Sequence, residues 1–156
     1  EANPAHAELA ACITVGHGAL IRTIKDLSPE QLVSIPAGFK NNVLWNLGHV
    51  PTVLTTLVCK PAEMEPVIPK HYETLFKNGS SPADWSQPLD ASEVIEVFKS
   101  SVPKVCDALK AGALDHFVAF DLFPGYTIGS VEHALAFHAF HSGIHLGAVN
   151  ALKKFL

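Results

Sequence analysis

The chain has 156 residues, of which 48% are hydrophobic and 17% charged, and its formal net charge is −4. This composition excludes a disordered or fibrous protein and predicts one folded domain, residues 1–156, large enough to bury a core. The single arginine and the scattered lysines form no basic stripe, so we do not expect nucleic acid as a partner. No cationic amphipathic segment, signal pattern or unbroken apolar run of bilayer length stands out, so we do not expect a membrane either.

Three cysteines, Cys12, Cys59 and Cys106, lie far apart and form no C-x-x-C pair. This pattern favours free thiols over a disulfide framework or a thiolate zinc site, with one bridge and a spare thiol as the alternative. We therefore expect three small buried side chains and a reducing, cytoplasmic compartment.

The first predicted helix covers residues 5–27. Apolar side chains recur in it at three- and four-residue spacing, and His17 takes one place in that series. We expect this imidazole to face the core. Ser28-Pro29-Glu30 then ends the helix and can open a short turn of another, because proline suits a first helical position.

The second predicted helix covers residues 41–58 and has an unusually polar face. Asn42, Trp45 and Asn46 lie within about 60° of His49 when successive residues turn by about 100°. An ordinary packing face would carry fewer polar side chains, so we interpret these residues as pocket walls around the imidazole. The alternative is a helix whose polar residues only satisfy one another.

Two residues beside His49 predict local distortion. Gly48 permits close approach of another backbone, and Pro51 lacks the N–H that would bond the Leu47 carbonyl. We therefore expect a kink near His49.

Residues 59–90 are rich in proline, with a short helical piece at residues 71–76. A connection of this length is uncommon in a compact domain and either covers a site or crosses the length of a bundle. His71 is expected to be exposed on it.

The third predicted helix begins at Asp90 as its cap, with Glu93 placed for a variant capping box, and ends at Gly112. It has an apolar stripe and no histidine, so its role is structural, and Pro103 should bend it. Residues 114–130 are expected to form a loop, because no segment of the chain alternates like a credible strand. Three polar residues of this loop are predicted to be solvated: Asp115, His116 and Asp121.

The last predicted helix covers residues 130–155. His141 and His145 lie one turn apart on one face, and His138 lies on the same side. Several apolar residues share that direction, so the face should be buried: Ala134, Phe137, Ile144, Ala148 and Leu152.

A single histidine on an apolar face is usually a hydrogen-bonded core residue, but several buried imidazoles need many partners where water is scarce. A divalent cation satisfies two or three at once, and His-x-x-x-His spacing suits one ion. A third ligand must come from another helix. His138 is the alternative to His145 as the partner of His141, because residues three apart can also chelate.

Four long amphipathic helices with one long crossover, between the second and third, predict an all-α four-helix bundle. Cofactor sites in such bundles are built from facing helices. His49, His141, His145 and His17 all lie in the middle parts of their helices, so we expect them to converge.

The chain resembles the DinB/YfiT-like superfamily of metal-dependent enzymes. The resemblance rests on Asn-x-x-Trp-x-x-Gly-His at residues 42–49 and His-x-Gly-x-His-x-Gly at residues 141–147. The run Tyr-x-x-Leu-Phe-x-x-Gly-Ser at residues 72–80 and the order of the helices are also similar, so the likeness covers nearly the whole chain. Where many relatives carry glutamate and glutamine, this chain has Ser142 and Ala148.

The resemblance implies that His49, His141 and His145 bind a divalent metal, commonly nickel or zinc, with open positions for water or substrate. It also implies a small-molecule substrate and, in several members, a low-molecular-weight thiol used by S-transferases or a maleylpyruvate-type isomerase. A homodimer is a further expectation. Ser142 and Ala148 leave open which residues orient the imidazoles.

The residues themselves favour one reaction class. Hydrolysis needs a general base, yet no Asp or Glu lies on the inward faces of the second and last helices, and Glu132 points about 180° away from His141. A thiolate is already a nucleophile, so thiol transfer or isomerisation fits better. The alternatives are a metal-dependent hydrolase and a non-enzymatic metal- or ligand-binding bundle.

Overall fold

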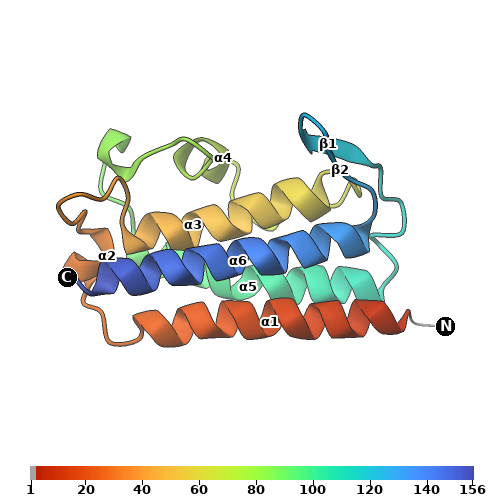
Figure 1. Cartoon of the computed structure of the whole chain (residues 1–156), viewed down its shortest axis with the longest axis horizontal. Helices are drawn as coiled ribbons and strands as arrows, with labels where there is room; N and C mark the ends of the chain where they lie inside the picture. Colours follow the sequence, from red (N-terminus) through yellow and green to blue (C-terminus); the bar gives the residue numbers. More distant parts are fainter. Residues whose placement is uncertain (1–2) are drawn as a thin grey trace.

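The computed structural model describes residues 3–156. Four long helices form a bundle (Figure 1): α1 (Pro4–Ile24), α3 (Val43–Leu54), α5 (Ala91–Lys110) and α6 (Val131–Lys153). Both α1 and α3 pack against α5 and α6, which places α1 and α3 at diagonal corners. The predicted all-α four-helix bundle is confirmed.

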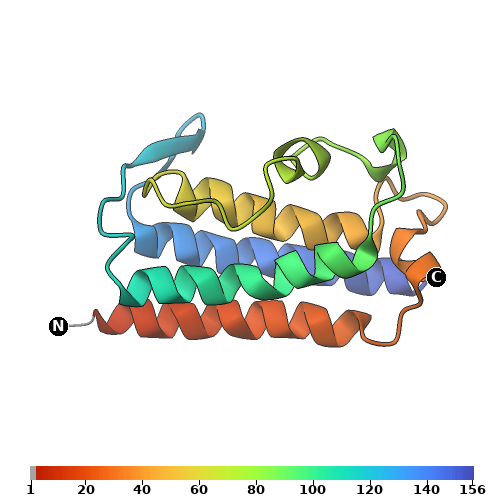
Figure 2. The same cartoon turned by 180° about the vertical axis from the view of Figure 1, so that it is seen from behind.

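Helices α1 and α6 run in the same direction. Near their first turns His6 Nε2 lies 2.7 Å from Glu132 Oε1, and near their last turns Lys153 Nζ donates to the Thr23 carbonyl. Helices α3 and α5 run the opposite way, because the segment that joins them returns along the bundle (Figure 2). The long crossover predicted between the second and third long helices is therefore confirmed.

Short helical elements occupy the connections. They are α2 (Pro29–Val33), the π-helical turn η1 (Thr55–Cys59), α4 (Tyr72–Leu75) and the 3-10 turn η2 (Pro82–Asp84). Of these, η1 directly continues α3, and α4 and η2 lie in the crossover. His71, just before α4, is exposed as predicted.

Capping residues decide where the helices begin. The Asn42 side chain accepts the Trp45 N–H at 2.7 Å, so Asn42 is the cap of α3 and not part of its first turn. Asp90 caps α5 as predicted, but it accepts the N–H of Ser92. Within residues 3–156 Glu93 makes no capping bond, and its Oε1 lies 4.0 Å from His71 Nε2.

The change of helical geometry after Pro51 lies beyond His49, and the kink predicted near His49 stays a prediction. Helix α3 continues through Pro51, and its α-helical ladder changes to π-helical bonds in η1, where Lys60 N–H bonds the Thr55 carbonyl at 3.0 Å. A π-helical turn is one way in which a helix accommodates the loss of a backbone hydrogen bond, here the one that Pro51 cannot donate.

The prediction of a plain loop at residues 114–130 is wrong. Strands β1 (Phe120–Phe123) and β2 (Tyr126–Ile128) form an antiparallel hairpin, whose turn contains Gly125 with φ of 83°. Strands of three and four residues offer too few positions for alternation to stand out. Asp115, His116 and Asp121 are exposed, as expected.

Two burial predictions also fail. Cys59 is buried and Cys106 half-buried, but Cys12 is exposed, although all three are free thiols as predicted. Ile144, assigned to the buried face of the last helix, is 51% exposed. The buried stripe of α6 is centred on Leu135, His138 and Ser142, so the histidine face is rotated toward the edge of the core.

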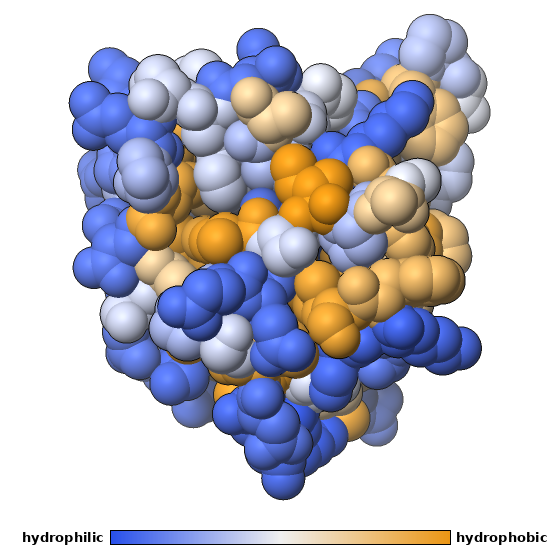
Figure 3. Space-filling model, turned by 90° about the vertical axis from the view of Figure 1, so that its left-hand side faces the viewer, coloured by the Kyte–Doolittle hydropathy of each residue, from blue (hydrophilic) through white to orange (hydrophobic). Residues whose placement is uncertain are grey.

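One end of the bundle has an apolar surface. Figure 3 views the end at which the C-terminus lies and shows hydrophobic side chains inside a hydrophilic surround. The exposed hydrophobic residues of the nearby segments are Val33, Ile35 and Phe155, and Phe155 packs on Phe39 with ring centroids 5.4 Å apart.

By length and composition alone, α1 could cross a membrane. In the structure it is a bundle helix whose buried residues are Ile13, His17, Leu20 and Ile24. Only 22% of its most apolar stretch is buried, however. Much of its apolar surface therefore faces outward.

Gly48 makes room for an aromatic ring and not, as predicted, for another backbone. A Cβ at this position would lie 2.3–2.5 Å from three ring carbons of Phe76. The crossover can therefore pack directly against the middle of α3, next to His49.

We predict that Gly48→Ala lowers the free energy of unfolding by about 1–3 kcal/mol, because the added methyl overlaps the buried Phe76 ring. Urea denaturation measures the change. Gly16→Ala is the matched control, since its Cβ would meet Ser142 Cβ at an ordinary 3.8 Å and should be neutral or stabilising by up to about 1 kcal/mol. Equal stability of the two variants would contradict the assigned packing.

Candidate metal centre

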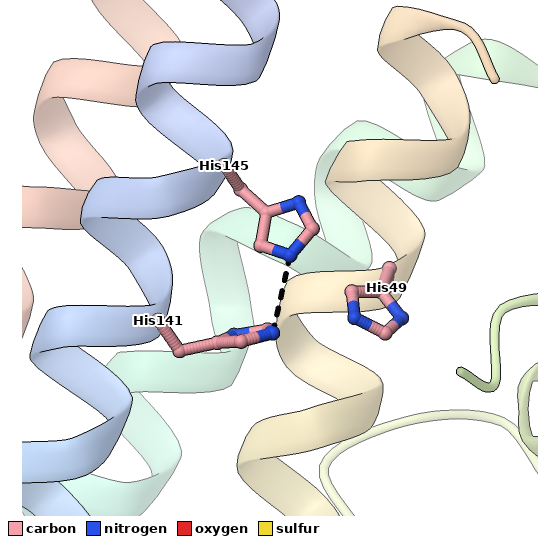
Figure 4. A group of neighbouring side chains, drawn as sticks. All are labelled: His49, His141 and His145. Atoms are coloured by element: carbon pink, nitrogen blue, oxygen red, sulfur yellow. Dashed lines mark hydrogen bonds between the residues drawn. The ribbon is translucent and has the colours of Figure 1, made fainter. Parts of the chain in front are cut away.

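Three histidines from two helices converge on one point. His49 comes from α3, and His141 and His145 come from α6 (Figure 4). One ring nitrogen from each lies within 4.8 Å of the others. His49 is buried and the other two are half-buried, so the cluster lies at the edge of the core. The structure thus brings these three residues together, as predicted.

Hydrogen bonds fix the orientation of two of the rings. His49 Nδ1 lies 2.6 Å from the Phe76 carbonyl oxygen, which can only accept, so Nδ1 carries the proton. His145 Nδ1 lies 2.7 Å from Asn46 Oδ1 and likewise donates. The amide is oriented by its own NH₂ group, which donates to the Asn42 carbonyl at 2.8 Å. Both Nε2 atoms are therefore left with free lone pairs.

His141 has no such partner. Its Nδ1 is buried and makes no hydrogen bond to the described residues, and its Nε2 lies 3.1 Å from His145 Nε2 (Figure 4). Without a cation, one of the two facing Nε2 atoms must carry a proton to avoid two opposed lone pairs. A buried polar atom without a partner is costly, so the cluster is incomplete as a purely hydrogen-bonded core.

The residues present fit a divalent ion. Two nitrogen ligands at about 2.0–2.1 Å from one ion and about 100° apart are separated by about 3 Å, and the two Nε2 atoms on α6 are 3.1 Å apart. The second-sphere bonds from Nδ1 to a carbonyl and an amide oxygen are those typical of metal-binding histidines. His49, His141 and His145 would hold the ion.

Burial keeps these imidazoles neutral. Desolvation, with a smaller effect of the neighbouring histidines, lowers the pKa of His145 to about 3 and that of His141 to about 4. Desolvation also lowers the pKa of His49, opposed by its bond to the Phe76 carbonyl. Neutral imidazole is the form that binds metal, so the site is ready for a cation at neutral pH.

The crossover supplies one wall of the site. The Trp45 ring stacks on His49 with centroids 4.4 Å apart, and its Nε1–H donates to Ser80 Oγ at 2.9 Å. Trp45 thus lies against His49, and its role as a pocket wall stays a prediction. Asn46 orients His145, whereas Asn42 serves as helix cap and donates to the Val33 carbonyl at 2.9 Å.

His17 and His138 form a separate buried pair. Their Nε2 atoms are 2.9 Å apart, and Ser142 Oγ lies 3.3 Å from His138 Nε2. The interpretation of His138 as an alternative ligand is therefore not supported, nor does His17 reach the three-histidine cluster. His138 lies about 60° around α6 from His141 and bonds His17 on α1, whereas the His141 ring lies next to His49 on α3.

Sequence reasoning missed two contributors to the site, the Phe76 carbonyl and Ser80. Both lie in the crossover, and both appeared only as letters of a family motif. A residue pattern does not show which backbone carbonyl will bond a side chain. The bond from His49 to the Phe76 carbonyl is therefore visible only in the structure, where Phe76 packs on Gly48.

No carboxylate joins the cluster within residues 3–156. Glu132, the acid nearest in sequence on α6, bonds His6 and Asn3 near the start of α1. The expectation that Glu132 points away from His141 is confirmed.

The family model of the DinB superfamily matches residues 15–149. The chain belongs to the DinB superfamily. The matched range contains all three histidines of the cluster, the whole of α3 and α5, most of α6 and residues 15–24 of α1. No match was found among curated proteins. Membership and the histidine cluster together fit a metal-binding site.

We predict that acid destabilises the metal-free protein through the His17–His138 pair. Burial lowers the pKa of His17 to about 4 from 6.5, so between these values the unfolded chain binds more protons. The free energy of unfolding has its full value above about pH 6.5. As the pH falls further, it decreases by at most about 1.4 kcal/mol per pH unit for each such histidine. Urea denaturation at about pH 7 and pH 5 measures the loss. A His17→Leu, His138→Leu double variant should lose less; an equal loss would contradict the assignment.

We predict that Asn46→Ala weakens zinc or nickel binding by about 10–100-fold, because His145 loses the acceptor that fixes its ring. Competition with a chromophoric chelator measures the affinity. Asn150→Ala, at an exposed position of α6, is the control and should bind as the wild type does. Unchanged affinity in Asn46→Ala would exclude the proposed orienting role.

Proposed function

We propose that this protein is a metal-dependent enzyme that binds one nickel or zinc ion through His49, His141 and His145. The reaction we propose is transfer of a low-molecular-weight thiol to a small electrophile, or thiol-dependent isomerisation of a small molecule. The observation that carries this proposal is a cluster of three neutral histidines that no carboxylate of residues 3–156 joins.

The donor set supports the choice of chemistry. Three neutral ligands leave the charge of a dication uncompensated, and the bound ion would then act as a Lewis acid that lowers the pKa of a thiol or water. The chain's own residues hold the imidazoles in place: Asn46 and the Phe76 carbonyl orient two rings, and Trp45 covers one face of His49.

The missing base favours a thiol over water as the nucleophile. Activated water needs a group to accept its proton, and within the described residues the cluster offers none. A thiolate attacks directly. In a transfer, the S–H bond breaks and a sulfur–carbon bond forms, the leaving group departs with its electron pair, and the thiol proton goes to solvent.

The metal site is tested first, on tag-free protein prepared without chelator. We expect about one equivalent of nickel or zinc by elemental analysis, lost in His49→Ala and in His141→Ala. His71→Ala, at an exposed position outside the site, should retain the metal. Absence of metal after reconstitution, or retention in the site variants, would overturn the proposal and leave a hydrogen-bonded core.

The reaction is tested on the reconstituted protein. Bacillithiol, mycothiol and glutathione are each paired with a chlorinated aromatic electrophile, and maleylpyruvate serves as the isomerisation substrate. We expect metal-dependent product formation with at least one thiol, and loss of the rate in His141→Ala. Metal-dependent ester or amide hydrolysis without thiol reactivity would favour a hydrolase, and metal binding without reaction would favour a binding module.

A further inference from the structure

Four aromatic side chains form a continuous row from the hairpin to the middle of α6. We call Phe123, Tyr126, Phe137 and Phe140 the aromatic row. Phe123 stacks on Tyr126 with ring centroids 4.9 Å apart, and the Tyr126 ring lies 5.7 Å from that of Phe137. Phe137 in turn lies 5.8 Å from Phe140. These separations are typical of attractive aromatic pairs, so each ring helps to hold the next in place.

The row is open to solvent. Phe140 is 62% exposed and Phe123 52%, and the two rings between them are half-buried. Figures 1 and 2 show the hairpin near the start of α6, on the same side of the bundle as α4. The hairpin end of the row therefore lies on the side from which the crossover contacts α3.

Phe137 brings the row within one helical turn of the candidate metal centre. It precedes His141 by four residues, which places it about 6 Å along α6 and about 40° around it. Solvent reaches His141 from that same side, because Ile144, about 60° away in this direction, is exposed and His138, about 60° away in the other, is buried. A molecule that enters from solvent and lies beside the cluster on this side would therefore contact Phe137.

Val53 of α3 belongs to the same layer. The His49 ring lies 5.1 Å from that of His141 and 4.8 Å from that of His145, so His49 is level with the turn between them. Val53 follows His49 by four residues and α3 runs opposite to α6, so Val53 is displaced along the bundle in the same direction as Phe137. Both side chains are half-buried. The layer beside the metal centre on the hairpin side is thus apolar and partly open.

His133 fixes the phenol of Tyr126 and its role in hydrogen bonding. His133 Nδ1 lies 3.4 Å from the backbone nitrogen of Gly129 and accepts its N–H, so Nε2 carries the proton of the neutral ring. This Nε2 donates to Tyr126 Oη at 3.1 Å. Within residues 3–156 the phenolic O–H has no acceptor, and it can therefore donate to a bound molecule.

We propose that the aromatic row binds the electrophile used at the metal centre, and that this electrophile is a flat aromatic or conjugated molecule with a hydrogen-bond acceptor. This inference rests on the proposed function, which supplies the reaction. A flat ring stacks on Phe137, and the Tyr126 O–H donates to a nitro, carbonyl or carboxylate oxygen of the same molecule. Phe137 and Tyr126 are therefore the residues that set specificity.

A small molecule fits the row better than a protein partner does. An aromatic side chain presents about 200 Å², and two of the four rings are half-buried. The exposed area of the row is therefore less than about half of the ~800 Å² that each partner contributes to a standard interface. One flat molecule needs no more than one or two of these rings.

Binding of 4-nitrobenzyl alcohol, a flat molecule with no leaving group, tests the row without any reaction. Chemical-shift titration of the zinc-loaded full chain measures the dissociation constant. We expect saturable binding that Phe137→Leu weakens about 5–10-fold, because the stacking partner is lost. Phe155→Leu, which removes a 65% exposed ring just after α6, is the matched control and should bind as the wild type does.

Two results would overturn the assignment of the row. One is the absence of saturable binding, or an equal loss in Phe137→Leu and in the control. The other is unchanged probe affinity combined with altered self-association of Phe137→Leu in sedimentation, which would assign the row to a protein partner.

The hydrogen bond is tested separately. The wild type should bind 4-nitrobenzyl alcohol about 3–10-fold more tightly than benzyl alcohol, because only the first carries a nitro acceptor for Tyr126. Tyr126→Phe keeps the ring and should abolish this preference. Thr127→Val, which removes a neighbouring hydroxyl that bonds Asp121, should retain it. A preference that survives in Tyr126→Phe would overturn the assigned donor.

Turnover separates this inference from the proposed function. With the thiol that supports transfer, the ratio of kcat/KM for 4-nitrobenzyl chloride to that for iodoethane should fall at least about five-fold in Phe137→Leu, at unchanged metal content. An unchanged ratio would overturn the row and leave the enzyme. Probe binding through Phe137 and Tyr126 without any turnover would overturn the proposed function and leave the row as a site for flat molecules.

Discussion

The candidate site depends on two hydrogen bonds made by Nδ1 atoms. The bond from His49 to the Phe76 carbonyl ties α3 to the crossover, and the bond from His145 to Asn46 ties α6 to α3. Each bond fixes a tautomer and turns an Nε2 lone pair toward the centre of the cluster. Without them, three buried imidazoles could satisfy one another in several ways, and no cation would be preferred.

The crossover acts on the site through packing. Phe76 can deliver its carbonyl to His49 because its ring lies against Gly48, where any side chain would collide. Ser80 holds the indole of Trp45 at its Nε1, and the indole stacks on the same imidazole. A long connection that returns the chain along the bundle therefore also holds two residues of the candidate site, His49 and Trp45, in place.

Five histidines of the core separate into two groups that serve different ends. His49, His141 and His145 direct nitrogens to a shared point, whereas His17 and His138 bond each other between α1 and α6. Burial disfavours protonation in both groups. Within residues 3–156, only the first group contains Nδ1 atoms with hydrogen-bond partners, those of His49 and His145, so burial alone does not make a histidine a ligand.

The sequence by itself determined the helical class, the long crossover and the candidate pair His141 and His145, because helical periodicity and His-x-x-x-His spacing are local properties of the chain. His49 completed the set through the resemblance of residues 42–49 to the DinB/YfiT-like superfamily. It did not determine the short hairpin at residues 120–128, whose strands are too brief to show alternation. Nor could it separate His138 from His145 as the partner of His141, or exclude Ile144 from the core, because both depend on how α6 is rotated and packed against the neighbouring helices. That rotation, and the Phe76 carbonyl bound to His49, were decided only by tertiary packing, which joins groups distant in sequence.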